Sequence, residues 1–164
     1  MAQRFEPTLF DKLFGAADVS ERGWTLEQLK ESVARDLEAL LNTRTALTEE
    51  SLEGYPHAAA SVLTYGMRDF ADLCLTSDED QKKVCAAVKL AVERHEPRLV
   101  NVTAAVRVQR RPVLRVQIQI EGTLRAAQES GAVRFSAMLK PWSQQYSVKQ
   151  TPATEDLPTE EGPA

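Results

Sequence analysis

Residues 99–121 read LVNVTAAVRVQRRPVLRVQIQIE, and this stretch decides the fold. Its first half alternates apolar and polar residues, which is the period of a strand with one buried face. The residues expected to share that face are Val100, Val102, Ala104, Val106 and Val108. After a turn at residues 109–112 the alternation resumes with Leu114, Val116, Ile118 and Ile120. The stretch therefore predicts two antiparallel strands with a short connection.

A third alternating run follows the loop around Ser130-Gly131 and contains Val133, Phe135, Ala137 and Leu139. Short connections and one apolar face per strand favour a three-stranded antiparallel meander. Helices predicted upstream would cover the apolar face of this sheet. The sequence thus predicts an α+β, two-layer domain in which N-terminal helices pack on the meander.

Two long helices are predicted before the strands. Thr25 is expected to cap the first, and Gln28, three residues later, completes a capping box. The apolar stripe of this helix contains Leu26, Leu29, Val33, Leu37, Leu40 and Leu41, and the helix is expected to end near residues 42–44. The second begins at Thr76 or Ser77 and ends before Pro97, because proline lacks an amide donor. Its apolar face contains Val84, Val88, Ala91 and Val92.

The two ends of the chain differ from this central domain. Residues 1–23 are predicted to hold a short amphipathic segment, with Leu9, Phe10, Leu13 and Phe14 at helical spacing, followed by a linker. By default the segment docks on its own domain, and the alternative is that it offers an apolar side to a partner. Residues 24–148 form the main domain. Residues 149–164 are rich in Pro, Thr and Glu and are predicted to be a disordered acidic tail.

Composition excludes several functional classes. The chain has 164 residues, of which 43% are hydrophobic and 27% charged, as in one ordinary globular domain. The net charge of −4 comes from the acidic tail, and a neutral body argues against nucleic-acid binding, which needs a clustered positive surface. No apolar run is long enough to span a bilayer, and the start lacks the apolar segment of a secretory signal. We therefore expect a cytoplasmic protein without direct membrane insertion.

No motif for catalysis, cofactor binding or metal binding is present in the sequence. The feature that stands out is Glu96-Pro97-Arg98, at the predicted junction of helix and strand. Pro97 stiffens this corner, so the flanking charges lose little conformational freedom when a partner binds. From the residues alone, however, the favoured interpretation is a local cap, with Arg98 against the last helix carbonyls and Glu96 paired with a nearby base.

The sequence resembles a known family in several motifs. Residues 26–44, LEQLKESVARDLEALLNTR, resemble the first-helix signature of the TssE-like baseplate proteins of type VI secretion systems. Residues 7–13, 55–56, 61–70 and the EPRL of 96–99 are similar to further motifs of that family, in the same order. Thr64 and Met67-Arg68 depart from its usual pattern. The ordered set is more specific than any single motif.

The resemblance implies a non-enzymatic subunit of a cytoplasmic baseplate that docks at the inner-membrane complex. In this family the subunit forms a wedge with TssF, TssG and TssK and gives the contractile TssB–TssC sheath a starting surface. The VgrG–Hcp spike and tube region is a further partner that the resemblance suggests. Its fold is similar to the handshake domain of the sheath subunit, which implies that a sheath subunit can add strands to the sheet.

The resemblance also assigns a role to the corner. Glu96, Pro97 and Arg98 would contact the helical core bundle of TssF and TssG, with Arg98 donating and Glu96 accepting hydrogen bonds. Arg35, Asp36 and Arg44 are then expected to fix loops rather than bind partners. Two rival functions stay open: a lysozyme-like peptidoglycan hydrolase, which would need a carboxylate pair and export, and a generic adaptor domain of the same fold.

Overall fold

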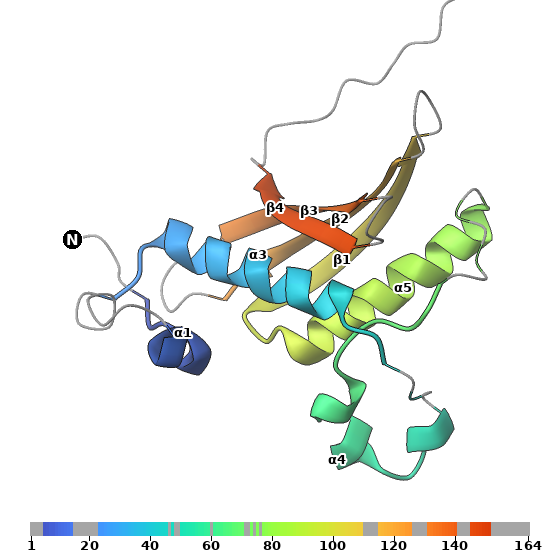
Figure 1. The fold of residues 1–164 in the computed structure, drawn as a ribbon, viewed down its shortest axis with the longest axis horizontal. Coiled ribbons are helices and arrows are strands. Elements are labelled where there is room, and N and C mark those ends of the chain that lie inside the picture. Colours follow the sequence, from blue (N-terminus) through green and yellow to red (C-terminus); the bar gives the residue numbers. More distant parts are fainter. Residues whose placement is uncertain are drawn as a thin grey trace, which may run out of the picture.

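The computed structural model describes residues 5–14, 23–45, 47, 50–59, 61–70, 73, 75, 77–109, 115–125, 131–140 and 145–151. The helices are α1 (Leu9–Phe14), α3 (Leu26–Asn42), α4 (Pro56–Ala59) and α5 (Asp78–His95), with 3-10 turns η1 (Glu50–Leu52) and η2 (Val62–Thr64). The strands are β1 (Leu99–Gln109), β2 (Arg115–Leu124), β3 (Gly131–Lys140) and β4 (Gln145–Thr151). Helices α3 and α5 lie along one face of the sheet (Figure 1). The predicted α+β class is therefore confirmed.

The prediction of three strands is wrong, because the described sheet has four, in the order β1-β2-β3-β4 with every neighbouring pair antiparallel. The additional strand, β4, has the sequence QYSVKQT and buries only Val148. One buried residue gives almost no alternation to detect. The strand also includes residues 149–151, the first three assigned to the tail, whereas residues 152–164 lie outside the described residues.

Helix α3 forms as its sequence predicts. Thr25 accepts from the backbone nitrogen of Gln28 at 3.3 Å, and the Gln28 side chain accepts from the backbone nitrogen of Thr25 at 2.9 Å. This reciprocal pair is the predicted capping box. Helix α5 begins after Ser77, whose hydroxyl makes no capping bond, and ends at His95, just before Pro97. Of the described helices, none is long and apolar enough to cross a membrane.

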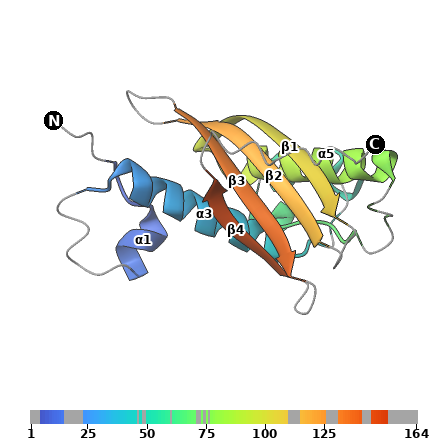
Figure 2. The ribbon, with the colours of Figure 1, turned by 90° about the horizontal axis from the view of Figure 1, so that it is seen from above.

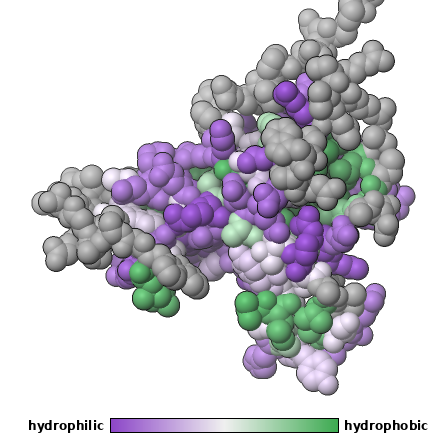
Figure 3. All heavy atoms as spheres, in the orientation of Figure 1, coloured by the Kyte–Doolittle hydropathy of each residue, from purple (hydrophilic) through white to green (hydrophobic). Residues whose placement is uncertain are grey.

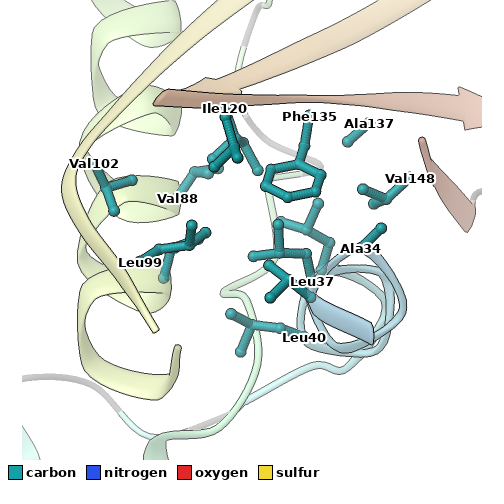
Figure 4. Packing of buried hydrophobic residues seen from close by; sticks show 14 of the residues in the cluster. Ala34, Leu37, Leu40, Val88, Leu99, Val102, Ile120, Phe135, Ala137 and Val148 are labelled. Atoms are coloured by element: carbon teal, nitrogen blue, oxygen red, sulfur yellow. The ribbon is translucent and has the colours of Figure 1, made fainter. Parts of the chain in front are cut away.

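The core lies between the two layers (Figure 4). Phe135 and Ile120 point from the sheet toward Leu37 of α3 and Val88 of α5, and all four side chains are fully buried. Burying a large apolar side chain contributes roughly 1.5–3 kcal/mol. This cluster therefore holds both helices against the sheet, and with them the corner that joins α5 to β1.

A β-bulge shifts the start of β1. The register changes between Val100 and Thr103, and Asn101 has a φ of 54°, in the left-handed region that asparagine tolerates. As a result Leu99 and Val102 are both buried, although three positions apart in a regular strand would face opposite sides. Leu99 thus takes the inward place predicted for Val100, which is only half-buried.

Candidate functional site

The structure brings all three predicted site residues together at the corner between α5 and β1. The backbone there is held by three hydrogen bonds, from Glu96 N to Val92 O (2.8 Å), from Leu99 N to Glu96 O (3.1 Å) and from Arg125 N to Arg98 O (2.7 Å). Pro97 lies exposed at the tip. The corner is therefore anchored on both sides and in the adjoining sheet.

Glu96 and Arg98 face each other across this turn. Arg98 Nε donates to Glu96 Oε1 at 2.6 Å, and Arg98 Nη2 donates to Glu96 Oε2 at 2.5 Å, which is a two-pronged contact between guanidinium and carboxylate. The backbone nitrogen of Arg98 also donates to Glu96 Oε1, at 3.2 Å. Glu96 is only 4% exposed. Its carboxylate is therefore engaged within the chain and holds the arginine in one orientation.

Arg98 also binds helix α3. Its Nη2 donates to Asp36 Oδ2 at 2.5 Å and its Nη1 to Ser32 Oγ at 3.2 Å. Burial lowers the pKa of Arg98, but hydrogen bonds to the Glu96 and Asp36 carboxylates and their charges outweigh it, so the pKa lies above its ordinary value. Glu96 thus pairs with a base, as the local-cap alternative holds. Arg98 binds α3 side chains, whereas that alternative places it against the last carbonyls of α5.

The same network fastens helix α1. Asp11 accepts from Ser32 Oγ at 3.1 Å and from Thr8 Oγ1 at 2.5 Å, and it forms an ion pair with Arg35. Helix α1 therefore docks on α3 through its polar side. Leu9 and Leu13 remain 70% and 64% exposed. The segment docks on its own domain and also presents apolar side chains to solvent.

A groove of about 920 Å³ runs between α1, α3, η2 and the corner, with Asp11, Asp36, Tyr65 and Arg98 among its lining residues. On the η2 side, Val62 and Leu63 are 81% and 57% exposed. Figure 3 shows apolar surface on α1 and, separately, around α4 and η2. The groove thus has a floor of paired charges and an exposed apolar residue, Val62, on its η2 side.

The titratable groups of the groove are held in structural contacts. His95 Nε2 lies 3.0 Å from the Thr64 carbonyl oxygen, and its ring meets Tyr65 edge-on with centroids 5.3 Å apart. Burial lowers the pKa of His95, which favours the neutral ring, donating from Nε2 to that carbonyl. Burial, followed by the charges of Asp36 and Glu96, raises the pKa of Tyr65. These contacts hold the two rings in place at the side of the groove.

The sequence predicted the position of the corner but not the residues of this chain that Glu96 and Arg98 contact. Arg35 and Asp36, which were expected to fix loops, pair with Asp11 of helix α1 and with Arg98 at the corner. Ser32, 1% exposed, links both pairs and was not singled out. A signal was present, since residues 32, 35 and 36 lie on one side of the helix at three- and four-residue spacing. Among the described residues, no three His, Cys, Asp or Glu side chains gather as a metal site would require.

The structure is a two-layer α+β domain with a rigid charged corner beside a groove. The chain matches the family model described as baseplate wedge protein gp25 over residues 27–129, more than half of its 164 residues, and it belongs to this family. This is the family that includes the TssE-like baseplate proteins, so the resemblance is confirmed. No curated protein and no solved structure matches the chain.

Proposed function

We propose that this protein is a non-enzymatic structural subunit of a type VI secretion baseplate. In this proposal it joins the TssF–TssG–TssK wedge to the contractile TssB–TssC sheath and helps sheath assembly to start. The baseplate lies in the cytoplasm, docked at the inner-membrane complex. Membership of the baseplate wedge protein gp25 family supports the structural role. The observation that carries the proposed wedge contact is the immobilised corner at the groove, beside the exposed Val62.

The groove suits a helical partner such as the TssF–TssG core bundle. A helix with its side chains is about 10–12 Å across, and its apolar face would rest against Val62, which lines the groove, and the neighbouring exposed Leu63. Burial of apolar surface is the dominant favourable contribution in most protein–protein association.

Polar specificity would come from the corner itself. Within the described part of the chain, four of the five N–H groups of Arg98 are used, which leaves one on Nη1 for a partner. The Asp36 side chain, 43% exposed, can accept a further hydrogen bond, and the exposed Pro97 adds an apolar contact. Glu96 acts by positioning Arg98. Because these groups are already fixed, little side-chain entropy is lost on docking.

The test is a binding measurement between the intact chain and purified TssF–TssG complex. Val62→Asp and Leu63→Asp place a charge on the groove rim at exposed positions, so folding should be unaffected. The matched control is Met138→Asp on β3, an apolar residue 42% exposed and outside the groove lining. We expect the rim variants to weaken binding at least about ten-fold, the effect of roughly 1.4 kcal/mol, and the control to bind normally.

Two results would overturn the proposal. If both rim variants bind TssF–TssG as well as the intact chain, the groove is not the contact site. If the intact chain itself does not bind, the baseplate wedge role fails, and the generic adaptor becomes the better interpretation of the fold.

A further inference from the structure

The sheet has a second face, which we call the outer face, on the side away from helices α3 and α5. Figure 2 looks onto this face, with the strands in front of the two helices. Side chains alternate along each strand, so the outer face contains the residues that flank the buried ones. The register aligns one such row across the four strands, consisting of Ala105, Gln119, Ser136 and Lys149.

The outer face is strongly basic. Every charged residue of the described strands lies on it, and Glu121 is the single acid among them. Glu121 pairs with Arg134 at 2.7 Å. The remaining bases are exposed and have no ion pair or hydrogen bond within the described part of the chain, and they are Arg107, Arg115, Lys140 and Lys149. The protein thus concentrates bases without a counter-charge on one surface.

Three of these bases crowd one end of the outer face. Arg115 is the first residue of β2 and Lys140 is the last of β3. Arg107 of β1 pairs with Gln117, two residues beyond Arg115, so the two arginines are diagonal neighbours, which are about 7–8 Å apart. Like charges at this distance repel one another, and an anion between them removes the repulsion. This end of the face therefore favours an acidic occupant.

The acidic part of the chain begins beside this face. Strand β4 ends at Thr151, which pairs with Arg134 of β3 and shares the outer face with it. Residues 152–164 lie outside the described residues, and their sequence contains no base and four acids, which are Glu155, Asp156, Glu160 and Glu161. An acidic segment thus follows directly on a basic face that lacks counter-charges.

The reach of this segment matches the dimensions of the face. Neighbouring strands are about 4.8 Å apart, so β4 and β1 are separated by about 14 Å across the sheet. The crowded end, at the pair of Gln145 and Lys140, lies about 20 Å from Thr151 along β4. An extended chain spans about 3.3 Å per residue, which allows Glu160 and Glu161 to lie up to about 30 Å from Thr151. Both acids can therefore reach the crowded bases.

We propose that the acidic tail, from residue 152 onward, folds back and binds the outer face of its own sheet. Glu160 and Glu161 pair with the three crowded bases, and Glu155 and Asp156 pair with Lys149, which lies near the end of β4. The inference goes beyond the proposed function, because the groove proposed for TssF–TssG lies on the helix side of the sheet.

Tethering favours the tail over an acidic segment of another chain. Exposed ion pairs are individually weak and are screened by salt. A tethered segment nevertheless acts at an effective concentration in the millimolar range, which a separate chain seldom reaches. The tail therefore covers the outer face at low ionic strength and leaves it at high salt. A partner that uses this face has to displace the tail.

The test is an NMR comparison of the full chain with a synthetic peptide of residues 152–164, which gives the reference for an unbound tail. Backbone amide resonances of residues 155–161 are recorded for both at about 0.01 M and about 1 M salt, between which the Debye length falls from about 30 Å to about 3 Å. Arg115→Glu and Lys140→Glu reverse charges in the crowded cluster. The matched control is Lys82→Glu, at an exposed base on α5 that also has no ion pair among the described residues.

We expect the tail amides of the intact chain to differ from those of the peptide at low salt and to coincide with them at high salt. Arg115→Glu and Lys140→Glu should each reduce the low-salt difference at least about two-fold, and Lys82→Glu should leave it unchanged. If Arg115→Glu does not fold, Lys140→Glu decides.

Three results would overturn the proposal. Tail amides that coincide with the peptide at low salt would leave the outer face open to an acidic segment of another chain. A difference that survives both face variants would place the tail elsewhere. A difference that grows with protein concentration would show that the tail binds a second copy. None of these results depends on TssF–TssG binding, so the proposed function is tested separately.

Discussion

Replacing Arg98 by methionine should destabilise the domain, and the structure gives the size of the effect. The Glu96 side chain is 5% exposed and the Arg98 side chain 21%. Removal of the guanidinium leaves the Glu96 carboxylate buried with only the backbone nitrogen of Arg98 as a donor. Removal of one partner of a buried ion pair costs about 3–5 kcal/mol. Because Arg98 is partly exposed, we expect about 3 kcal/mol, near the lower end of that range.

The assay is urea unfolding followed by circular dichroism at pH 7. A loss of about 3 kcal/mol corresponds to a decrease in Tm of roughly 6–12 °C for a domain of this size. Arg35→Met is the matched control, because it removes an arginine that is 62% exposed and pairs with Asp11, which should cost at most about 1 kcal/mol. The double variant Glu96→Gln/Arg98→Met removes the stranded charge and should recover at least about 1 kcal/mol.

Two outcomes would refute this reasoning. Arg98→Met could be no less stable than Arg35→Met, which would mean that the change does not leave the Glu96 carboxylate buried without a compensating charge. Alternatively, Glu96→Gln could lower the stability of the Arg98→Met protein further, which would mean that the carboxylate stabilises the corner without its arginine.

Three further changes probe other parts of the structure. Burial lowers the pKa of His95 in the folded state, so the unfolded chain binds more protons as the pH falls below about 6.5. The stability of the fold should therefore decrease from pH 7 to pH 5. His95→Gln should reduce this pH dependence, measured by urea titrations at the two pH values. Phe135→Ala removes a fully buried ring and should cost about 3–5 kcal/mol in the same assay. Gly66→Ala should lower the free energy of unfolding by about 2 kcal/mol, because Gly66 has a φ of 118° and an added Cβ would lie 2.7 Å from Thr43 O. A thermal melt unchanged from the intact chain would show that the backbone relaxes at this position.

The elements that the sequence predicted are those with strong local signals. Helix α3 has a capping box at Thr25 and an apolar stripe, and both are visible in a short window of sequence. Strand β4 was missed because its neighbours, not its own residues, define it. Its outward amides bond to Asn42 and Glu38, which lie 104 and 110 residues away along the chain. A periodicity in seven residues cannot report such contacts.

The candidate site shows the same division. Pro97 fixes the position of the corner, and that was readable from the sequence. The direction of the charged side chains could not be predicted from the sequence. Arg98 is held by Asp36, which is 62 residues away along the chain, and the two meet only after α3 has packed on the sheet. Likewise the spacing of Leu9 and Leu13 predicted one apolar side on α1. The pairing of Asp11 with α3 decides that this side faces solvent.

The most direct test of the docking role is amide hydrogen exchange on the intact chain, alone and in complex with TssF–TssG. Binding is expected to slow exchange in α1, around Leu63 and at residues 95–99, which flank the groove, and to leave β4 unchanged. Protection confined to β4 or to the outer face of the sheet, with none at residues 95–99, would contradict it.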